Sequence, residues 1–151
     1  MSWTQLLANK DAQKHTTSKQ ELDNMRELIA RDLADAAVAR LSADRRFATA
    51  YSAALQAANM AIACAGYRIT AKIGHHRVSL ESAGLALGES AESLTDYFET
   101  CRRKRNQIDY TQSHVATETE AKEIVTKATE FYALVEAWIS KNHPQFAHRK
   151  P

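Results

Sequence analysis

Apolar residues recur at intervals of three and four along most of this chain, the spacing that places side chains on one face of an α-helix. The pattern predicts four long helices, at about residues 18–42, 44–66, 90–113 and 117–143, and one short helix at about 79–87. Ser18 with Glu21, and Thr117 with Glu120, have the spacing of capping boxes at helix starts. We therefore predict an all-α fold, an antiparallel up-and-down helical bundle of four long helices plus one short helix.

The two ends of the chain lack this periodicity. Residues 1–16 are polar and aperiodic apart from a few apolar anchors, and we expect a flexible arm there. Residues 142–151 form a polar, basic tail. Between them, residues 17–141 are long enough to form a single helical domain with a substantial core.

Composition supports the helical prediction and limits the class of function. Hydrophobic residues make up 44% and charged residues 25%, and four glycines and two prolines supply little turn material for a β-sandwich. The net charge of +2 is too small for a global attraction to nucleic acid, so any such attraction must come from local clusters. No apolar run approaches the ~18 residues of a membrane span and no secretory signal is visible, so we expect a cytoplasmic protein without membrane contact.

The most informative segment is a basic run inside the helix predicted over residues 90–113. Its cations are Arg102, Arg103, Lys104 and Arg105. On a helical wheel Arg105 falls in an apolar stripe with Phe98 and Ile108, and a guanidinium there needs a partner, a wet cleft or a ligand. Two interpretations remain open. Arg105 pairs with Asp109 one turn later, or it forms a phosphate or RNA site with Asn106.

A pair of histidines could add chemistry to such a site. His75 and His76 follow Gly74 in a segment, residues 67–77, that we predict to be irregular. No CxxC or HExxH pattern accompanies them, so we predict no metal and no cofactor. One of these histidines could approach Arg105, or both could simply cap the end of a neighbouring helix.

Several short motifs follow one another in order along the predicted helices. They are Arg46-Phe47, Ala50-Tyr51, Gly66-Tyr67-Arg68, Gly74-His75-His76-Arg77, and Arg105-Asn106 followed by Tyr110. Over about residues 40–140, this order resembles small bacterial members of the HEPN superfamily, the higher eukaryotes and prokaryotes nucleotide-binding domains.

The resemblance implies an all-helical bundle whose function involves RNA or nucleotides. Many HEPN proteins are metal-independent endoribonucleases that form homodimers, so that two copies of the motif meet in one cleft. They occur as toxins of toxin–antitoxin modules and in phage defence, while other members only bind nucleotides or RNA. By this resemblance Arg105 would hold the scissile phosphate, and a histidine that follows it would transfer a proton.

Tyr110 stands where the family motif has that histidine. A phenol with an ordinary pKa of about 10 is a poor base at neutral pH, although it can contact a phosphate or stack on a base. His114, one helical turn beyond Tyr110, is one candidate for the missing base, or it is only a histidine that interacts favourably with the helix dipole. His75 and His76 are the other candidates.

These features predict a HEPN-type RNA- or nucleotide-binding protein, either a ribonuclease with altered chemistry or a member that has lost cleavage. The predicted catalytic residues are Arg105, Asn106, Tyr110 and His114, and the predicted substrate-binding residues are Arg102, Arg103, Lys104, His75 and His76. A function of another class also fits the sequence. The chain could be a non-catalytic helical interaction module for a protein partner, such as a nucleotidyltransferase-type antitoxin, with a purely structural Arg105–Asp109 pair.

Overall fold

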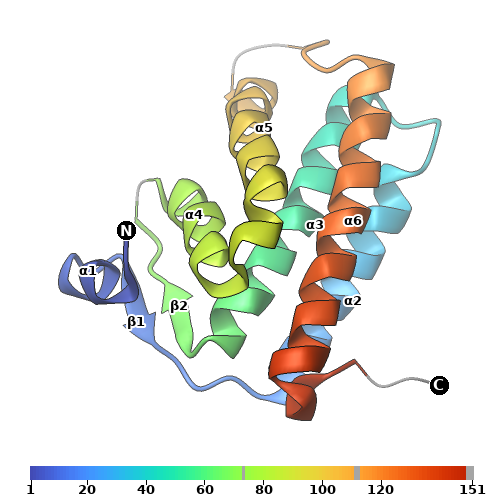
Figure 1. The fold of residues 1–151 in the computed structure, drawn as a ribbon. Coiled ribbons are helices and arrows are strands. Elements are labelled where there is room, and N and C mark those ends of the chain that lie inside the picture. Colours follow the sequence, from blue (N-terminus) through green and yellow to red (C-terminus); the bar gives the residue numbers. More distant parts are fainter. Residues whose placement is uncertain (73, 111–112, 149–151) are drawn as a thin grey trace.

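The computed structural model describes residues 1–72, 74–110 and 113–148, and for Asp109 and Tyr110 it describes the backbone alone. Its helices are α1 (Trp3–Ala8), α2 (Lys19–Ala36), α3 (Ala43–Cys64), α4 (His75–Leu87), α5 (Glu92–Tyr110) and α6 (Glu118–Asn142) (Figure 1). Two strands, β1 (Ala12–Lys14) and β2 (Tyr67–Ile69), and two 3-10 turns, η1 (Glu89–Ala91) and η2 (Pro144–Phe146), complete the described elements. The predicted all-α bundle is confirmed, and none of its described helices is long and apolar enough to cross a membrane.

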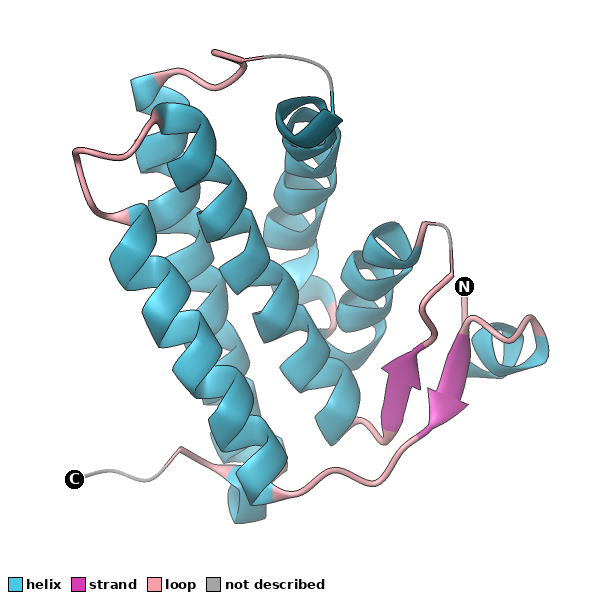
Figure 2. Ribbon diagram, turned by 180° about the vertical axis from the view of Figure 1, so that it is seen from behind, coloured by secondary structure: helices cyan, strands magenta, loops and turns pink. Residues whose placement is uncertain are grey.

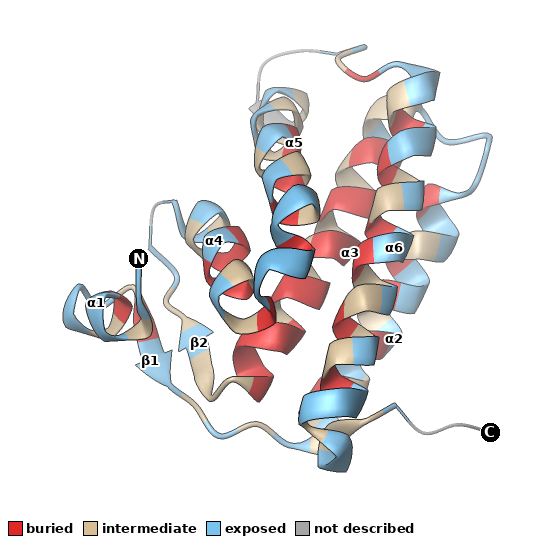
Figure 3. Ribbon diagram, in the orientation of Figure 1, coloured by how far each residue is buried: buried red, intermediate tan, exposed pale blue. Residues whose placement is uncertain are grey.

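Helix α3 lies at the centre of the bundle and packs against α2, α4, α5 and α6 (Figure 2). Its sequence explains this position, because its alanines are small enough to let several helices approach closely. Ala50, Ala54, Ala57, Ala58 and Ala61 are all fully buried, as the red face of α3 in Figure 3 shows. Larger side chains from the neighbouring helices fill the remaining space. Phe98 of α5 and Phe131 of α6 are fully buried, with ring centroids 5.5 Å apart.

Side-chain caps fix the starts of the long helices. The Thr117 hydroxyl accepts a hydrogen bond from the Glu120 amide while the Glu120 carboxylate accepts from the Thr117 amide, so the capping box predicted for α6 is present. Ser18 caps α2 by accepting from the Glu21 amide. The Glu21 carboxylate, however, binds Thr17 and His15 instead of returning to the cap, so this box is only half formed.

The first sixteen residues contain regular structure where the sequence predicts none. Helix α1 is followed by β1, which pairs antiparallel with β2 in a two-stranded sheet. The Trp3 ring stacks on Tyr67 with centroids 4.1 Å apart, and Leu6 is buried. The aperiodic pattern of this arm is therefore misleading, because its partners lie more than fifty residues away, in β2. The sheet fixes the arm against the start of the segment that leads to α4.

Two helix boundaries differ from the predicted ones, and both affect candidate site residues. Helix α4 begins at His75, not near residue 79, because Gly74 takes a left-handed conformation (φ 83°) that starts the helix. The described part of helix α5 extends to Tyr110, and Ser113 lies outside the helix. His75 and His76 therefore occupy the first turn of a helix, whereas His114 lies beyond α5 with a left-handed φ of 59°.

Candidate functional site

A cleft of about 620 Å³ lies between the start of α4 and the second half of α5. The described residues that line it are Ala71, Lys72, Gly74, His75, His76, Arg102, Arg105 and Asn106. Residues far apart in the sequence thus meet in one hollow, and five of the nine predicted site residues are among them. The lining has two arginines, a lysine and two histidines but no carboxylate among its described members, so it favours an anionic ligand.

Helix α5 supplies the cationic wall of the cleft. Arg102, Arg105 and Asn106 share one side of the helix because residues three and four apart are neighbours on its surface. Glu99 accepts a hydrogen bond from Arg102 at 2.9 Å, and this bond raises the pKa of the Arg102 guanidinium. Arg105 is half-buried, so its guanidinium lies deeper in the protein than those of exposed cations such as Arg103.

The first turn of α4 supplies the opposite wall and two imidazoles. The His75 and His76 rings meet edge to face with centroids 4.4 Å apart. The Nδ1 atom of His75 lies 2.9 Å from the Lys72 carbonyl oxygen. A carbonyl oxygen can only accept a hydrogen bond, so Nδ1 of His75 carries a proton and donates it to Lys72.

His76 is held in its neutral form. Burial lowers the pKa of its imidazole, and the nearby His75, Arg105 and Arg102 lower it further because each disfavours a second positive charge. A neutral imidazole that lines a cationic cleft can accept a proton from a bound ligand. His76 can therefore act as a base at neutral pH, which Tyr110 cannot, although the two residues lie on different helices.

Tyr51 of α3 lies beneath the cleft and is a residue that sequence reasoning did not single out for function. Its side chain is 1% exposed, and its ring centroid lies 6.0 Å from that of His76. Within the described part of the chain, its hydroxyl has no hydrogen-bond partner. Burial raises the pKa of Tyr51 to about 12, against the opposing effect of Arg102 and Arg105, so the phenol stays protonated. The Ala50-Tyr51 motif was the one sequence signal that pointed to it.

Other predicted site residues lie outside the cleft. Arg103 is exposed and Lys104 donates to Glu120 of α6 at 2.6 Å, and neither lines the cleft. The side chains of Tyr110 and Asp109 lie outside the described residues, so the roles predicted for Tyr110 and for an Arg105–Asp109 pair stay predictions.

The prediction that His114 continues the helix on the same face as Tyr110 is wrong, because the His114 backbone is a bend with a left-handed φ of 59°. His114 instead lies in the connection to α6, whose backbone binds the Asp44 carboxylate at the start of α3. The Ala116 amide donates to Asp44 Oδ1 at 2.7 Å. Burial opposes ionisation of Asp44, but this amide and those of Val115 and His114 outweigh it and lower the pKa of the carboxyl. His114 does not line the cleft.

A metal centre is not built into the described residues, which contain no group of three or more histidine, cysteine or acidic side chains placed to hold an ion.

Comparison with known proteins identifies a family for this chain. A family model described as SAV_6107-like HEPN matches residues 36–136, which include all of α3, α4 and α5 and most of α6. No curated protein and no solved structure matches the chain significantly. The matched region contains every described residue that lines the cleft.

Proposed function

The chain belongs to the SAV_6107-like HEPN family, and from this premise we propose that it binds RNA in the cleft between α4 and α5 and cleaves it without a metal ion. One observation carries the proposal. His75 and His76 of α4 line the same cleft as Arg102, Arg105 and Asn106 of α5, so phosphate-binding and proton-accepting groups lie together.

The arginines act on the phosphate. Arg105 supplies a guanidinium group that binds the phosphate oxygens and offsets the negative charge that develops in the transition state. Arg102, whose Nε and Nη2 donate to Glu99, adds positive charge to the same wall. The Asn106 amide donates a further hydrogen bond that fixes the orientation of the phosphate. The lack of a carboxylate among the described lining residues means that nothing in this lining repels the anion.

His76 acts as the base. Its neutral imidazole takes the proton of the ribose 2′-hydroxyl, whose oxygen then attacks the adjacent phosphorus. The new bond joins the 2′-oxygen to phosphorus, the bond from phosphorus to the 5′-oxygen breaks, and the leaving oxygen takes a proton from water. The products are a 2′,3′-cyclic phosphate and a 5′-hydroxyl. This use of His76 supplies the base that the family motif places at the position of Tyr110.

Two further elements of the proposal rest on family resemblance. A homodimer would bring two copies of the cleft together, and the setting would be a toxin–antitoxin or defence module with a partner such as a nucleotidyltransferase-type antitoxin. Neither is needed for the first test, which uses the purified chain.

That test is incubation with a mixed RNA pool in EDTA. Wild type should produce fragments with 2′,3′-cyclic phosphate ends, and Arg105→Ala should reduce the rate by ~10²–10³-fold because a transition-state charge contact is lost. Arg103→Ala is the matched control, since it removes the same charge from the same helix outside the cleft. Intact RNA with wild type would refute cleavage, and equal RNA affinity of Arg105→Ala and wild type, measured by fluorescence anisotropy, would refute the site.

A further inference from the structure

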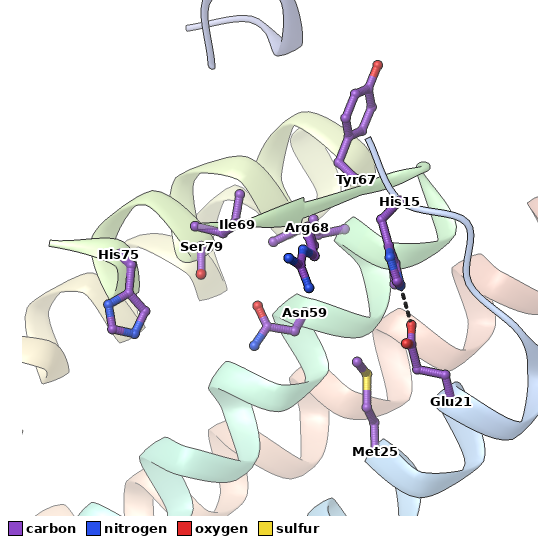
Figure 4. A pocket seen from close by; sticks show the side chains of 11 residues that line it. His15, Glu21, Met25, Asn59, Tyr67, Arg68, Ile69, His75 and Ser79 are labelled. Carbon is purple, nitrogen blue, oxygen red and sulfur yellow. Dashed lines mark hydrogen bonds and ion pairs between the residues drawn. The ribbon is translucent and has the colours of Figure 1, made fainter. Parts of the chain in front are cut away.

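A second hollow, of about 230 Å³, adjoins the cleft. It lies among the first half of α2, the last turns of α3, β2 and the start of α4 (Figure 4). His75 lines both hollows, so it forms the boundary between them. A ligand bound in the cleft could therefore extend past His75 into this pocket.

The walls of the pocket suit a flat, largely apolar ring with polar edges. Met25, Ile62 and Ile69 supply apolar surface. The Asn59 amide and the Ser79 hydroxyl are directed into the space between His75 and the opposite wall (Figure 4). Ser79 is 3% exposed, and among the described residues no hydrogen bond engages its hydroxyl or the Asn59 amide. Two polar groups thus converge on an apolar pocket with their bonding capacity unused, as in a built ligand site.

The far wall distinguishes this pocket from the cleft. Glu21 lines it and accepts hydrogen bonds from His15 and Thr17, both at 2.7 Å. Burial opposes ionisation of Glu21, but these bonds outweigh it and lower the pKa of the carboxyl, so it is ionised at neutral pH. An ionised carboxylate repels a phosphate and accepts N–H donors. Arg68 also lines the pocket, but its Nε donates to Gln13 at 3.0 Å, and its positive charge helps to lower the pKa of Glu21, so the two opposite charges offset each other. The pocket therefore favours an uncharged ring with polar groups at its edge, while the cleft, whose described lining has basic side chains and no carboxylate, favours the phosphate.

We propose that this pocket binds one nucleobase of the nucleotide whose phosphate occupies the cleft, with Asn59 and Ser79 contacting the edge of the base. The proposal rests on the proposed function, because it places the base relative to that phosphate. A volume of about 230 Å³ is smaller than the ~300–1,000 Å³ of pockets for whole drug-sized ligands, so it suits one ring system and not a complete nucleotide. An RNA base and the base of a free nucleotide share this chemistry.

The test measures base preference separately from phosphate affinity. Fluorescence anisotropy compares the four RNA homopolymers and an abasic RNA of equal length, using wild type, Asn59→Leu and Arg105→Ala. Wild type should prefer one base by about tenfold or more, as expected for hydrogen-bonded readout. Asn59→Leu should reduce that preference to about threefold or less while affinity for abasic RNA is kept. Arg105→Ala should weaken binding of every RNA, the abasic one included.

Controls separate the possible failures. Asn24→Leu, an exposed asparagine of α2 outside the pocket, should behave as wild type. Ser79→Ala is a second pocket variant in case Asn59→Leu does not fold, which circular dichroism would reveal. An unchanged base preference in a folded pocket variant would overturn the inference and leave the cleft intact, whereas no RNA binding by wild type would overturn the proposed function itself. Competition by nucleoside monophosphates, with inorganic phosphate as reference, shows whether a free nucleotide is also accepted.

Discussion

Arginines occur in two contrasting settings in this molecule. Arg26 of α2 is 4% exposed, donates twice to Glu136 of α6 at 2.8 and 2.9 Å, and donates to Asp23 at 2.7 Å. Arg46 of α3 is also buried and binds the Ala36 carbonyl and Glu118. The cleft arginines instead share their hollow with histidines and a lysine, and no carboxylate is among its described lining residues.

The difference shows how to interpret an arginine that falls in the apolar stripe of a helix. At Arg26 one opposite charge comes from its own helix and the other, Glu136, comes from α6, so the pair with Glu136 holds two helices together. Arg105 lines a hollow together with Arg102, Lys72 and two histidines, and such a concentration of basic side chains is expected where an anion binds. Position in the sequence does not separate the two cases, whereas the lining of the hollow does.

The largest expected effect tests the structural arginine. Arg26→Ala should lower the free energy of unfolding by ~3–5 kcal/mol, because Glu136 would remain largely buried without its partner. Arg105→Ala should lower it by about 1 kcal/mol or less. Urea unfolding with linear extrapolation measures both, and Arg31→Ala, an exposed arginine of α2, is the control. Equal losses at Arg26 and Arg105 would remove the contrast between the two settings.

The next effect concerns the proposed base. His76→Gln should slow RNA cleavage by ~10²-fold or more. Because the pKa of His76 lies below its ordinary value, wild-type activity should persist as the pH falls through about 6.5 and decline only at lower pH. The same pKa shift makes the free energy of unfolding depend on pH. The contribution of His76 is complete above its ordinary pKa, and it is lost as the pH falls through the lower pKa of the folded state.

His114→Asn is the matched control for the histidine, since asparagine tolerates the left-handed backbone at this position. It should cleave at the wild-type rate. A pH profile of cleavage that changes with His114→Asn and not with His76→Gln would show that His114, and not His76, is the base.

A smaller effect is expected at Tyr51. Its buried hydroxyl has no partner among the described residues, and such a group costs ~1–3 kcal/mol. Tyr51→Phe should therefore raise the free energy of unfolding by about 1 kcal/mol in the absence of RNA. Thermal unfolding measures this. A clear loss of stability would mean that the hydroxyl has a hydrogen-bond partner in the native protein and does not destabilise it.

The smallest effect separates the cleft from the rest of the basic run. Lys104→Ala removes a partly exposed ion pair with Glu120, so its stability cost should be below about 1 kcal/mol. RNA affinity measured by anisotropy should stay close to wild type, because Lys104 does not line the cleft. A fall comparable to that of Arg105→Ala would show that the RNA path extends over the α6 side of α5.

The sequence predicts the long helices well because their apolar periodicity is local information. It does not predict β1, because the three residues of this strand are ordered by pairing with Tyr67–Ile69, which lie far away in the sequence. The sequence also predicts too late a start for α4. Gly74 precedes the helix with a left-handed backbone and without the side-chain cap that usually marks a helix start.

The candidate site was predictable in parts. Arg105 and Asn106 follow from the motif, whereas their proximity to His75 and His76 is only one of two alternatives that the sequence allows. Arg103 and Lys104 belong to the same basic run but point elsewhere, which depends on the exact phase of α5 against its neighbours. Tyr51 could not be separated from ordinary core aromatics, because an unsatisfied hydroxyl is a property of the packed structure.

The small sheet that joins the N-terminal arm to β2 has an evolutionary consequence. The family match begins at residue 36 and includes the whole described lining of the cleft, whereas His15, Glu21 and Met25 of the adjoining pocket precede it. If the pocket binds a base, its lining comes partly from inside the family match, with Asn59 and Ser79, and partly from residues that precede it. Substitutions at His15, Glu21 or Met25 would then alter base preference without changing any described residue that lines the cleft.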